Sequence, residues 1–175
     1  QTPSVITMSE ETMICSQLWN KLTTNDPTIA QPWPDTTSVG YTRTVGEKTY
    51  FRNSVNCSRP EWLLYDFSLS VGDTFRYRWH YVFDVLDQYA LDFPMVVSSV
   101  DWYDYGGISR KVIYLAGTYE FWPGEHWPIY TLWIEGIGDF NYPFSDLINL
   151  YPGIAEVAYS LRCLKYGESV KYAAP

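Results

Sequence analysis

The chain has 175 residues and a formal net charge of −8 at pH 7, so its length predicts one domain with a substantial core. Its 12 Lys and Arg residues are scattered, which argues against nucleic acids and anionic membrane surfaces as partners because phosphate binding needs clustered basic side chains. No stretch approaches the roughly 18 apolar residues of a membrane-spanning helix. We expect a single β-rich domain over 1–175, with 1–40 as a helix and loop region packed on it.

Near the N-terminus the sequence predicts one short helix. Thr7 and Glu10 have the spacing of a capping box, and the apolar Ile14, Leu18 and Leu22 follow at intervals of four. The next segment, up to residue 40, carries three prolines among turn-forming residues. We expect that segment to be an irregular loop.

From Tyr41 onward the pattern is typical of successive β-strands. Gly46-Glu47, Gly106-Gly107 and Gly167-Glu168 each separate two strand-like segments and predict hairpins. A strand is also expected over 129–135, after a Trp- and Pro-rich loop. The spacing, without strand–helix alternation, predicts an all-β, mainly antiparallel β-sandwich or barrel-like sheet with long aromatic loops. The segments expected to be irregular are 118–128 and 139–156.

The segment EWLLYDFSLSVGDTF, residues 61–75, alternates apolar and polar side chains with a period of two. A three-residue loop at 72–74 would pair Val71 with Phe75 and keep the apolar side chains of both strands on one face. The alternative is a wider turn that joins two strands lying apart from each other.

Three motifs in this order, LLYDFSLSVGDT, LWIEGIG and the late LRCLKYGESVKY, resemble a family of secreted β-rich proteins common in Bacteroidota. The resemblance covers roughly residues 41 to 172. It implies an envelope or extracellular location, and many members carry a type IX secretion sorting domain. It brings no assigned activity, so no functional residue is carried over from it.

Other features of the sequence also suggest export. Aromatic residues make up 18% of the chain, and it begins at Gln1 rather than Met, as expected after removal of a signal peptide. The cysteines, Cys15, Cys57 and Cys163, allow one disulfide and one free thiol, and the three pairings remain open. No CxxC motif occurs, so we expect no metal and no cofactor.

Two glutamates offer a catalytic interpretation. Glu61 and Glu135 each stand near a Trp and an apolar strand, and two carboxylates flanking a sugar are what a polysaccharide hydrolase requires. The structural interpretation is that a Glu at a strand end accepts hydrogen bonds from turn amides.

The remaining polar candidates favour structural roles. We expect Asp66 to be a solvated or cross-strand partner and Asp73 to bond backbone amides in a turn. Asp101 and Asp104 are too few for a calcium loop. His80 shares the polar face of its strand with basic residues and is expected at the surface.

Aromatic residues in or beside turns are the stronger functional signal. Such side chains can stack on sugar rings or anchor a protein partner. The sequence therefore predicts a secreted or cell-surface, non-catalytic module that binds a glycan or another envelope protein or serves as a subunit of a surface assembly. The polysaccharide hydrolase is the alternative. The candidate ligand-binding residues are Trp102, Tyr103, Tyr105, Trp122, His126 and Trp127.

Overall fold

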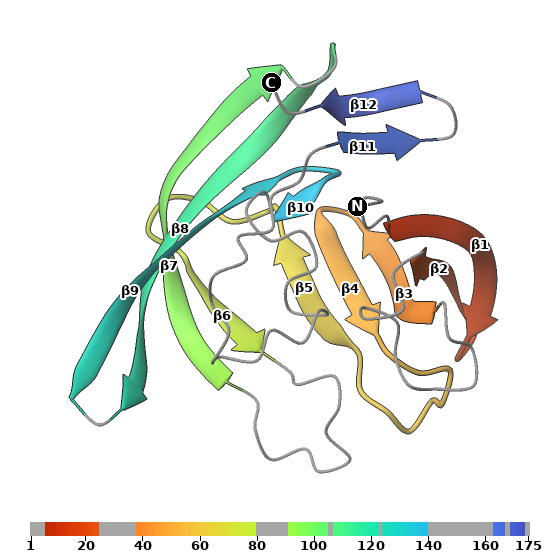
Figure 1. Cartoon of the computed structure of the whole chain (residues 1–175), viewed down its shortest axis with the longest axis horizontal. Helices are drawn as coiled ribbons and strands as arrows, with labels where there is room; N and C mark the ends of the chain where they lie inside the picture. The colour runs from red at the N-terminus through yellow and green to blue at the C-terminus, as the bar shows by residue number, and fades with distance from the viewer. Residues whose placement is uncertain are drawn as a thin grey trace, which may run out of the picture. The chain divides into compact units, whose positions relative to one another are not determined.

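A computed structural model gives an all-β protein, which confirms the predicted fold class (Figure 1). All described sheets are antiparallel, and the described residues contain no helix that is long and apolar enough to span a membrane. The structure describes residues 6–24, 38–79, 91–104, 107–122, 124–139, 163–166 and 169–173.

Twelve strands lie in three described sheets. The first sheet has the order β1-β2-β3-β4-β5, with β1 Ile6–Ile14, β2 Gln17–Thr24, β3 Ser38–Val45, β4 Lys48–Arg52 and β5 Trp62–Asp66. The second has the order β10-β9-β8-β7-β6, with β6 Thr74–Trp79, β7 Leu91–Asp104, β8 Ser109–Trp122, β9 Glu125–Ile134 and β10 Gly138–Asp139. The third pairs β11 Cys163–Tyr166 with β12 Ser169–Ala173.

The chain divides into two compact units, with a boundary between Asp66 and Phe67. The first sheet belongs to the first unit, and the second and third sheets belong to the second unit. The single domain expected from the chain length stays a prediction.

The predicted N-terminal helix is wrong, because this segment forms the β1–β2 hairpin. Cys15 and Ser16 both have positive φ, the conformation that a two-residue hairpin turn of type I′ requires. Leu18 is 52% exposed although Ile14 and Leu22 are buried, so the spacing of four does not mark one buried face. Glu10 approaches Lys21 on β2 at 3.8 Å instead of capping a helix.

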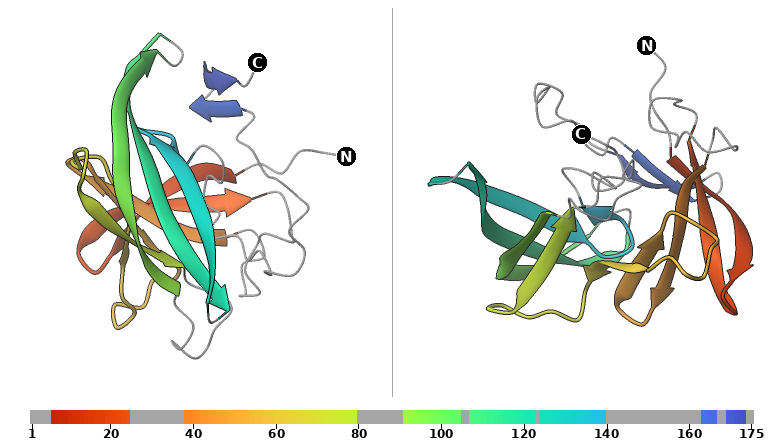
Figure 2. Two further views of the ribbon diagram at one scale, coloured as in Figure 1. Left: turned by 90° about the vertical axis from the view of Figure 1, so that its left-hand side faces the viewer. Right: turned by 90° about the horizontal axis from the view of Figure 1, so that it is seen from below.

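The first sheet continues from this hairpin through β3 and β4, the hairpin that Gly46-Glu47 predicted. Its strands follow one another around a strongly twisted sheet (Figure 2). Trp19, Leu22 and Phe51 are buried in it. The predicted loop over 23–40 lies outside the described residues except at its two ends, which are strand.

The stretch 61–75 joins two different sheets. β5 ends at Asp66, and β6 pairs with β7 rather than with β5, so the three-residue hairpin is wrong and the wider turn is correct. Asp73 stabilises this turn as expected, since its Oδ2 accepts a hydrogen bond from the amide of Ser70 at 2.8 Å. Its backbone also pairs with Val97 on β7.

One face of the second sheet is packed around Trp133. Trp133 is fully buried on β9 and packs edge-on against Phe75 of β6, with 4.7 Å between ring centroids. Phe67 also approaches Trp133 edge-on at 6.3 Å. The other buried apolar side chains of this face are Phe93, Met95, Val97, Ile113 and Leu115.

Long hairpins build the second sheet (Figure 2). β7 and β8 meet at the predicted Gly106-Gly107 position, although their last pair, Asp104 with Ser109, encloses four residues rather than two. The expected loop over 118–128 is wrong, because Trp122 pairs with Glu125 and both strands continue into it. The Gly167-Glu168 hairpin is confirmed as β11–β12.

Candidate functional site

The predicted aromatic site residues fall on the second sheet, at the ends of its long strands. Trp102 and Tyr103, near the end of β7, are 62% and 45% exposed. His126 is exposed at the start of β9, directly opposite Glu120. Tyr105 lies outside the described residues. Trp122 and Trp127 lie on the paired ends of β8 and β9, but their side chains are outside the described part.

Strand register separates these candidates between the two faces of the second sheet, because successive side chains point to opposite faces. Trp102 pairs with Lys111 and shares the face of the buried Ile113, two residues along β8. Tyr103 lies on the other face. His126 lies on the same face as Tyr103. It pairs with Glu120 of β8, and Tyr103 pairs with Arg110 of β8. Because Glu120 and Arg110 are separated by an even number of residues, their side chains point to the same face.

That outer face carries two tyrosines that the sequence analysis missed, Tyr114 and Tyr130. Tyr130 is 70% exposed and pairs with Ala116, which in turn pairs with Val96 of β7. The hydroxyl groups of Tyr114 and Tyr103 lie 3.5 Å apart. We call this surface the tyrosine face; it is formed by Val96, Tyr103, Tyr114, Ala116, Tyr130 and Leu132. The fully buried Val112 and Ile134 lie on the same side of the sheet, where Val112 falls between Tyr114 and the partner of Tyr103 on β8.

The tyrosine face runs diagonally over three adjacent strands. Tyr130 is on β9, Tyr114 lies two residues from Tyr130's partner on β8, and Tyr103 lies farther along on β7. An apolar–polar alternation over 129–135 would have revealed Tyr130, but apolar residues occupy both faces of that strand. Only the register shows that Trp133 points to the core and Tyr130 to the outside.

Polar groups border the tyrosine face. Asp101 is exposed on the same face, two residues from Tyr103. Glu120 is partly engaged, because its Oε1 accepts a hydrogen bond from the amide of Gly124 at 2.8 Å. Asp104, next to Tyr103 in the chain, accepts a hydrogen bond from the backbone amide of Gly107 at 2.7 Å and so stabilises the turn that follows β7. Of these three carboxylates, that of Asp101 is therefore the acceptor that no side-chain contact among the described residues engages, and it lies next to exposed rings.

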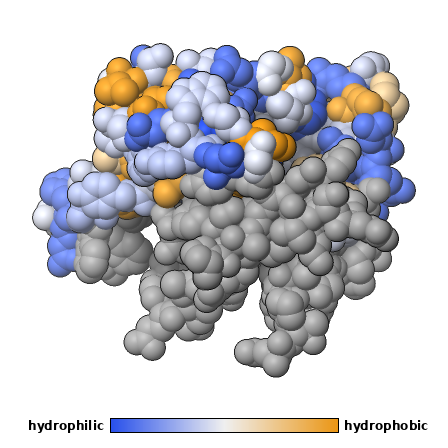
Figure 3. All heavy atoms as spheres, turned by 90° about the horizontal axis from the view of Figure 1, so that it is seen from above, coloured by the Kyte–Doolittle hydropathy of each residue, from blue (hydrophilic) through white to orange (hydrophobic). Residues whose placement is uncertain are grey.

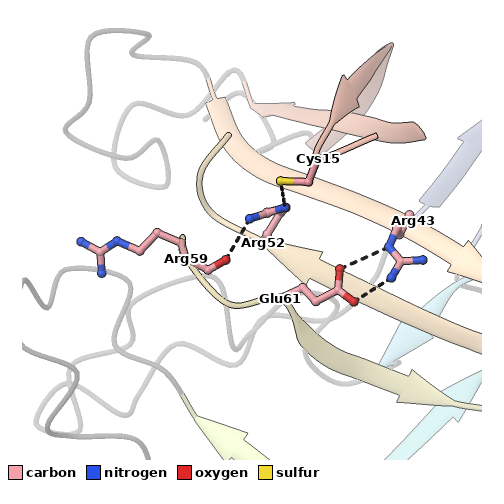
Figure 4. Close-up of polar contacts among 5 residues, drawn as sticks. All are labelled: Cys15, Arg43, Arg52, Arg59 and Glu61. Carbon is pink, nitrogen blue, oxygen red and sulfur yellow. Dashed lines mark hydrogen bonds and ion pairs between the residues drawn. The ribbon is translucent and has the colours of Figure 1, made fainter. Parts of the chain in front are cut away.

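Glu61, the first candidate catalytic carboxylate, is held by an arginine in the first unit (Figure 4). Arg43 reaches its two oxygens through Nη2 at 2.7 Å and Nε at 3.4 Å. The Arg43 guanidinium also lies over the rings of Trp19, at 5.0 Å, and Tyr50, at 4.6 Å. This two-point contact engages both oxygens of the Glu61 carboxylate, so the group already has a structural partner.

Glu135, the second candidate, lies in the second unit and is tied to β8. Its Oε2 accepts a hydrogen bond from the backbone amide of Lys111 at 3.3 Å. Its carbonyl oxygen accepts a hydrogen bond from Arg110 Nη1 at 2.7 Å. The acceptor role expected from the sequence is present, although the donor is a strand amide rather than a turn amide. Both carboxylates thus have structural partners, and they belong to different units.

Asp66 is buried instead of solvated, and it is a cross-strand partner as predicted. Its Oδ2 lies 3.1 Å from Lys48 Nζ, and the two residues are paired directly across β4 and β5. His80 lies outside the described residues.

A second polar cluster surrounds the disulfide, which joins Cys15 to Cys57 and so decides the pairing left open by the sequence. Arg52 is buried beside it, with Nη1 3.1 Å from Cys15 Sγ (Figure 4). Its Nη2 donates to the carbonyl oxygens of Asn56 and Arg59, both at 2.9 Å. Arg52 therefore fixes the segment that carries Cys57.

The described residues contain no group of three or more His, Cys, Asp or Glu side chains placed to hold a metal ion. Hydrophobic residues on the face drawn in Figure 3 form separate spots among hydrophilic ones rather than one broad patch.

Comparison with protein-family models, with curated proteins and with solved structures finds no match to this chain.

Proposed function

We propose that the protein is a non-catalytic carbohydrate-binding module, exported to the cell surface or beyond, and that the tyrosine face is its binding surface. The observation that carries the proposal is the alignment of Tyr103, Tyr114 and Tyr130 on the outer face of one sheet, with two of the three more than two-fifths exposed.

The chemistry of the face suits a sugar. A tyrosine ring offers an apolar surface to the C–H face of a pyranose, and its hydroxyl group can bond to a sugar hydroxyl. Asp101 adds an exposed carboxylate acceptor on the same face. Together with the net charge of −8, this carboxylate favours an uncharged glycan over an anionic one.

Two features support the location. The Cys15–Cys57 disulfide is typical of proteins that leave the reducing cytosol. The resemblance of the LLYDFSLSVGDT and LWIEGIG motifs to a secreted Bacteroidota family points the same way. A type IX export route remains part of this proposal.

Affinity electrophoresis through gels containing uncharged polysaccharides tests the proposal, with isothermal titration against oligosaccharides of any polymer that retards the protein. Tyr130→Ala and Tyr103→Ala should each weaken binding by about 5-fold, since one ring stacked on a sugar contributes on the order of 1 kcal/mol. Tyr130→Phe should retain most of the affinity, because it keeps the ring.

Leu18→Ala is the matched control, because it removes an exposed apolar side chain from the first sheet and should leave binding unchanged. Failure of the wild-type protein to bind any glycan in a broad array would overturn the carbohydrate proposal. Binding that both tyrosine variants retain in full would move the site away from the tyrosine face.

A further inference from the structure

The Cys15–Cys57 disulfide has a buried cation at one of its two sulfur atoms. Arg52 is only 3% exposed, and its Nη1 lies 3.1 Å from the Sγ atom of Cys15 (Figure 4). No described hydrogen bond joins a cation to the Sγ atom of Cys57. The two sulfur atoms of this bond therefore have different electrostatic surroundings.

Within the described part of the chain, the charge of Arg52 is matched by carbonyl dipoles and by the Trp19 ring, whose centroid lies 5.4 Å from its guanidinium carbon. Its described acceptors, besides Cys15, are the carbonyl oxygens of Asn56 and Arg59, and no carboxylate among the described residues forms an ion pair with it. Its Nε has no hydrogen-bond partner among the described residues. A buried cation of this kind strongly favours a negative charge that forms in contact with it.

Both cysteines are nevertheless exposed at the surface of the first unit. A small thiol can therefore reach the bond, while the guanidinium lies beneath it. In thiol–disulfide exchange, the sulfur that departs most easily is the one whose thiolate is best stabilised.

We propose that this disulfide is a thiol-exchange site with a fixed direction. An incoming thiolate attacks Cys57 Sγ and forms a new S–S bond there. The Cys15–Cys57 bond breaks, and its electron pair leaves on Cys15 Sγ as a thiolate in contact with the Arg52 guanidinium. The product is a mixed disulfide at Cys57, and attack by the Cys15 thiolate on that mixed disulfide restores the original bond and releases the small thiol.

Reaction of the full chain with glutathione tests the direction without any mutation. The mixture is quenched at short times with N-ethylmaleimide and digested without reduction, and mass spectrometry locates the two labels. The expected product carries glutathione on Cys57 and maleimide on Cys15. Equal labelling of the two residues, or glutathione mainly on Cys15, would overturn the proposal.

Arg52→Gln tests the cause, because it removes the charge and keeps a polar side chain of similar length. Its rate of exchange at Cys57 should fall by about 10-fold, and its preference for Cys57 should weaken. Arg52→Lys should recover part of the rate by restoring the charge without the second carbonyl contact.

Two arginines provide matched controls. Arg43 lies over the same Trp19 ring as Arg52 but bonds to Glu61, and Arg59 contributes only its carbonyl oxygen while its side chain points away from Cys15 (Figure 4). Arg43→Gln and Arg59→Gln should leave rate and direction unchanged. If either slows exchange as much as Arg52→Gln, general loss of positive charge or of stability explains the effect, and the proposal fails.

Discussion

Lys48 and Asp66 face each other directly across β4 and β5, with Nζ and Oδ2 3.1 Å apart. The lysine side chain is 44% exposed and the aspartate side chain 8% exposed, so an accessible cation covers a buried carboxylate. The hydrogen bond to Asp66, followed by the charge attraction to it, raises the pKa of Lys48 above its ordinary value of 10.5.

This pair predicts a pH dependence at the alkaline end. A pKa that is higher in the folded state gives stability that is complete below about pH 10.5 and is lost as the pH rises through the folded-state pKa. Urea unfolding of the wild type and of Lys48→Met should differ at about pH 8, and this difference should shrink at about pH 11.5. A difference that stays constant with pH would contradict the ion pair as its cause.

Gly40→Ala should destabilise the first unit by about 2 kcal/mol or more, because this glycine combines positive φ with close packing. A Cβ atom here would collide with the Phe51 ring and lie 2.8 Å from the carbonyl oxygen of Arg52. Gly46→Ala is the control, since its φ is also positive but its surroundings are open. Thermal unfolding should show a much smaller loss for Gly46→Ala; equal losses would show that backbone strain alone matters.

Trp133→Ala should cost about 3 to 5 kcal/mol of unfolding free energy, because it removes a fully buried ring from between Phe67 and Phe75. Tyr130→Ala, on the same strand and pointing to the outer face, should change stability by less than about 1 kcal/mol. Chemical denaturation measures both. A large loss for Tyr130→Ala would mean that this side chain supports the fold. The effect of this variant on glycan binding would then have to be corrected for its loss of stability.

Peptide mapping without reduction should recover Cys15 and Cys57 in one linked pair of peptides, with Cys163 in neither of them. Cys57→Ser should lower the unfolding free energy by about 2 to 4 kcal/mol, as expected for opening a closed loop with a sequence separation of 42. Cys163→Ser should have no such effect. A linkage between Cys163 and either of the other cysteines would contradict the pairing.

The local chemistry of turns was the most reliable part of the sequence analysis. Gly46 and Gly167 mark hairpins that the structure confirms. Gly46 has positive φ, a conformation that allows two strands to meet within a few residues. The all-β class followed from the same signals. Where the turn contains Cys15 and Ser16 instead, no such signal exists, and the apolar spacing of four suggested a helix that is absent.

The candidate site could be predicted only in part. Tyr103 and His126 share the outer face of the second sheet, whereas Trp102, the immediate neighbour of Tyr103, belongs to the opposite face. Tyr114 and Tyr130 were missed, because apolar side chains on both faces of β8 and β9 hide which side is covered. A Pro-Gly pair made 118–128 resemble a loop, although the long β8–β9 hairpin passes through most of it.

By itself, the sequence determined the strand-rich class, the glycine hairpins and the acidic charge, all of which depend on neighbouring residues or on the total composition. Only the tertiary structure decided the disulfide pairing, the contact of Arg52 with Cys15, and the face on which each tyrosine lies. These features depend on strand register and on contacts between residues distant in the chain. A shift of one residue in register would exchange the two faces of a strand.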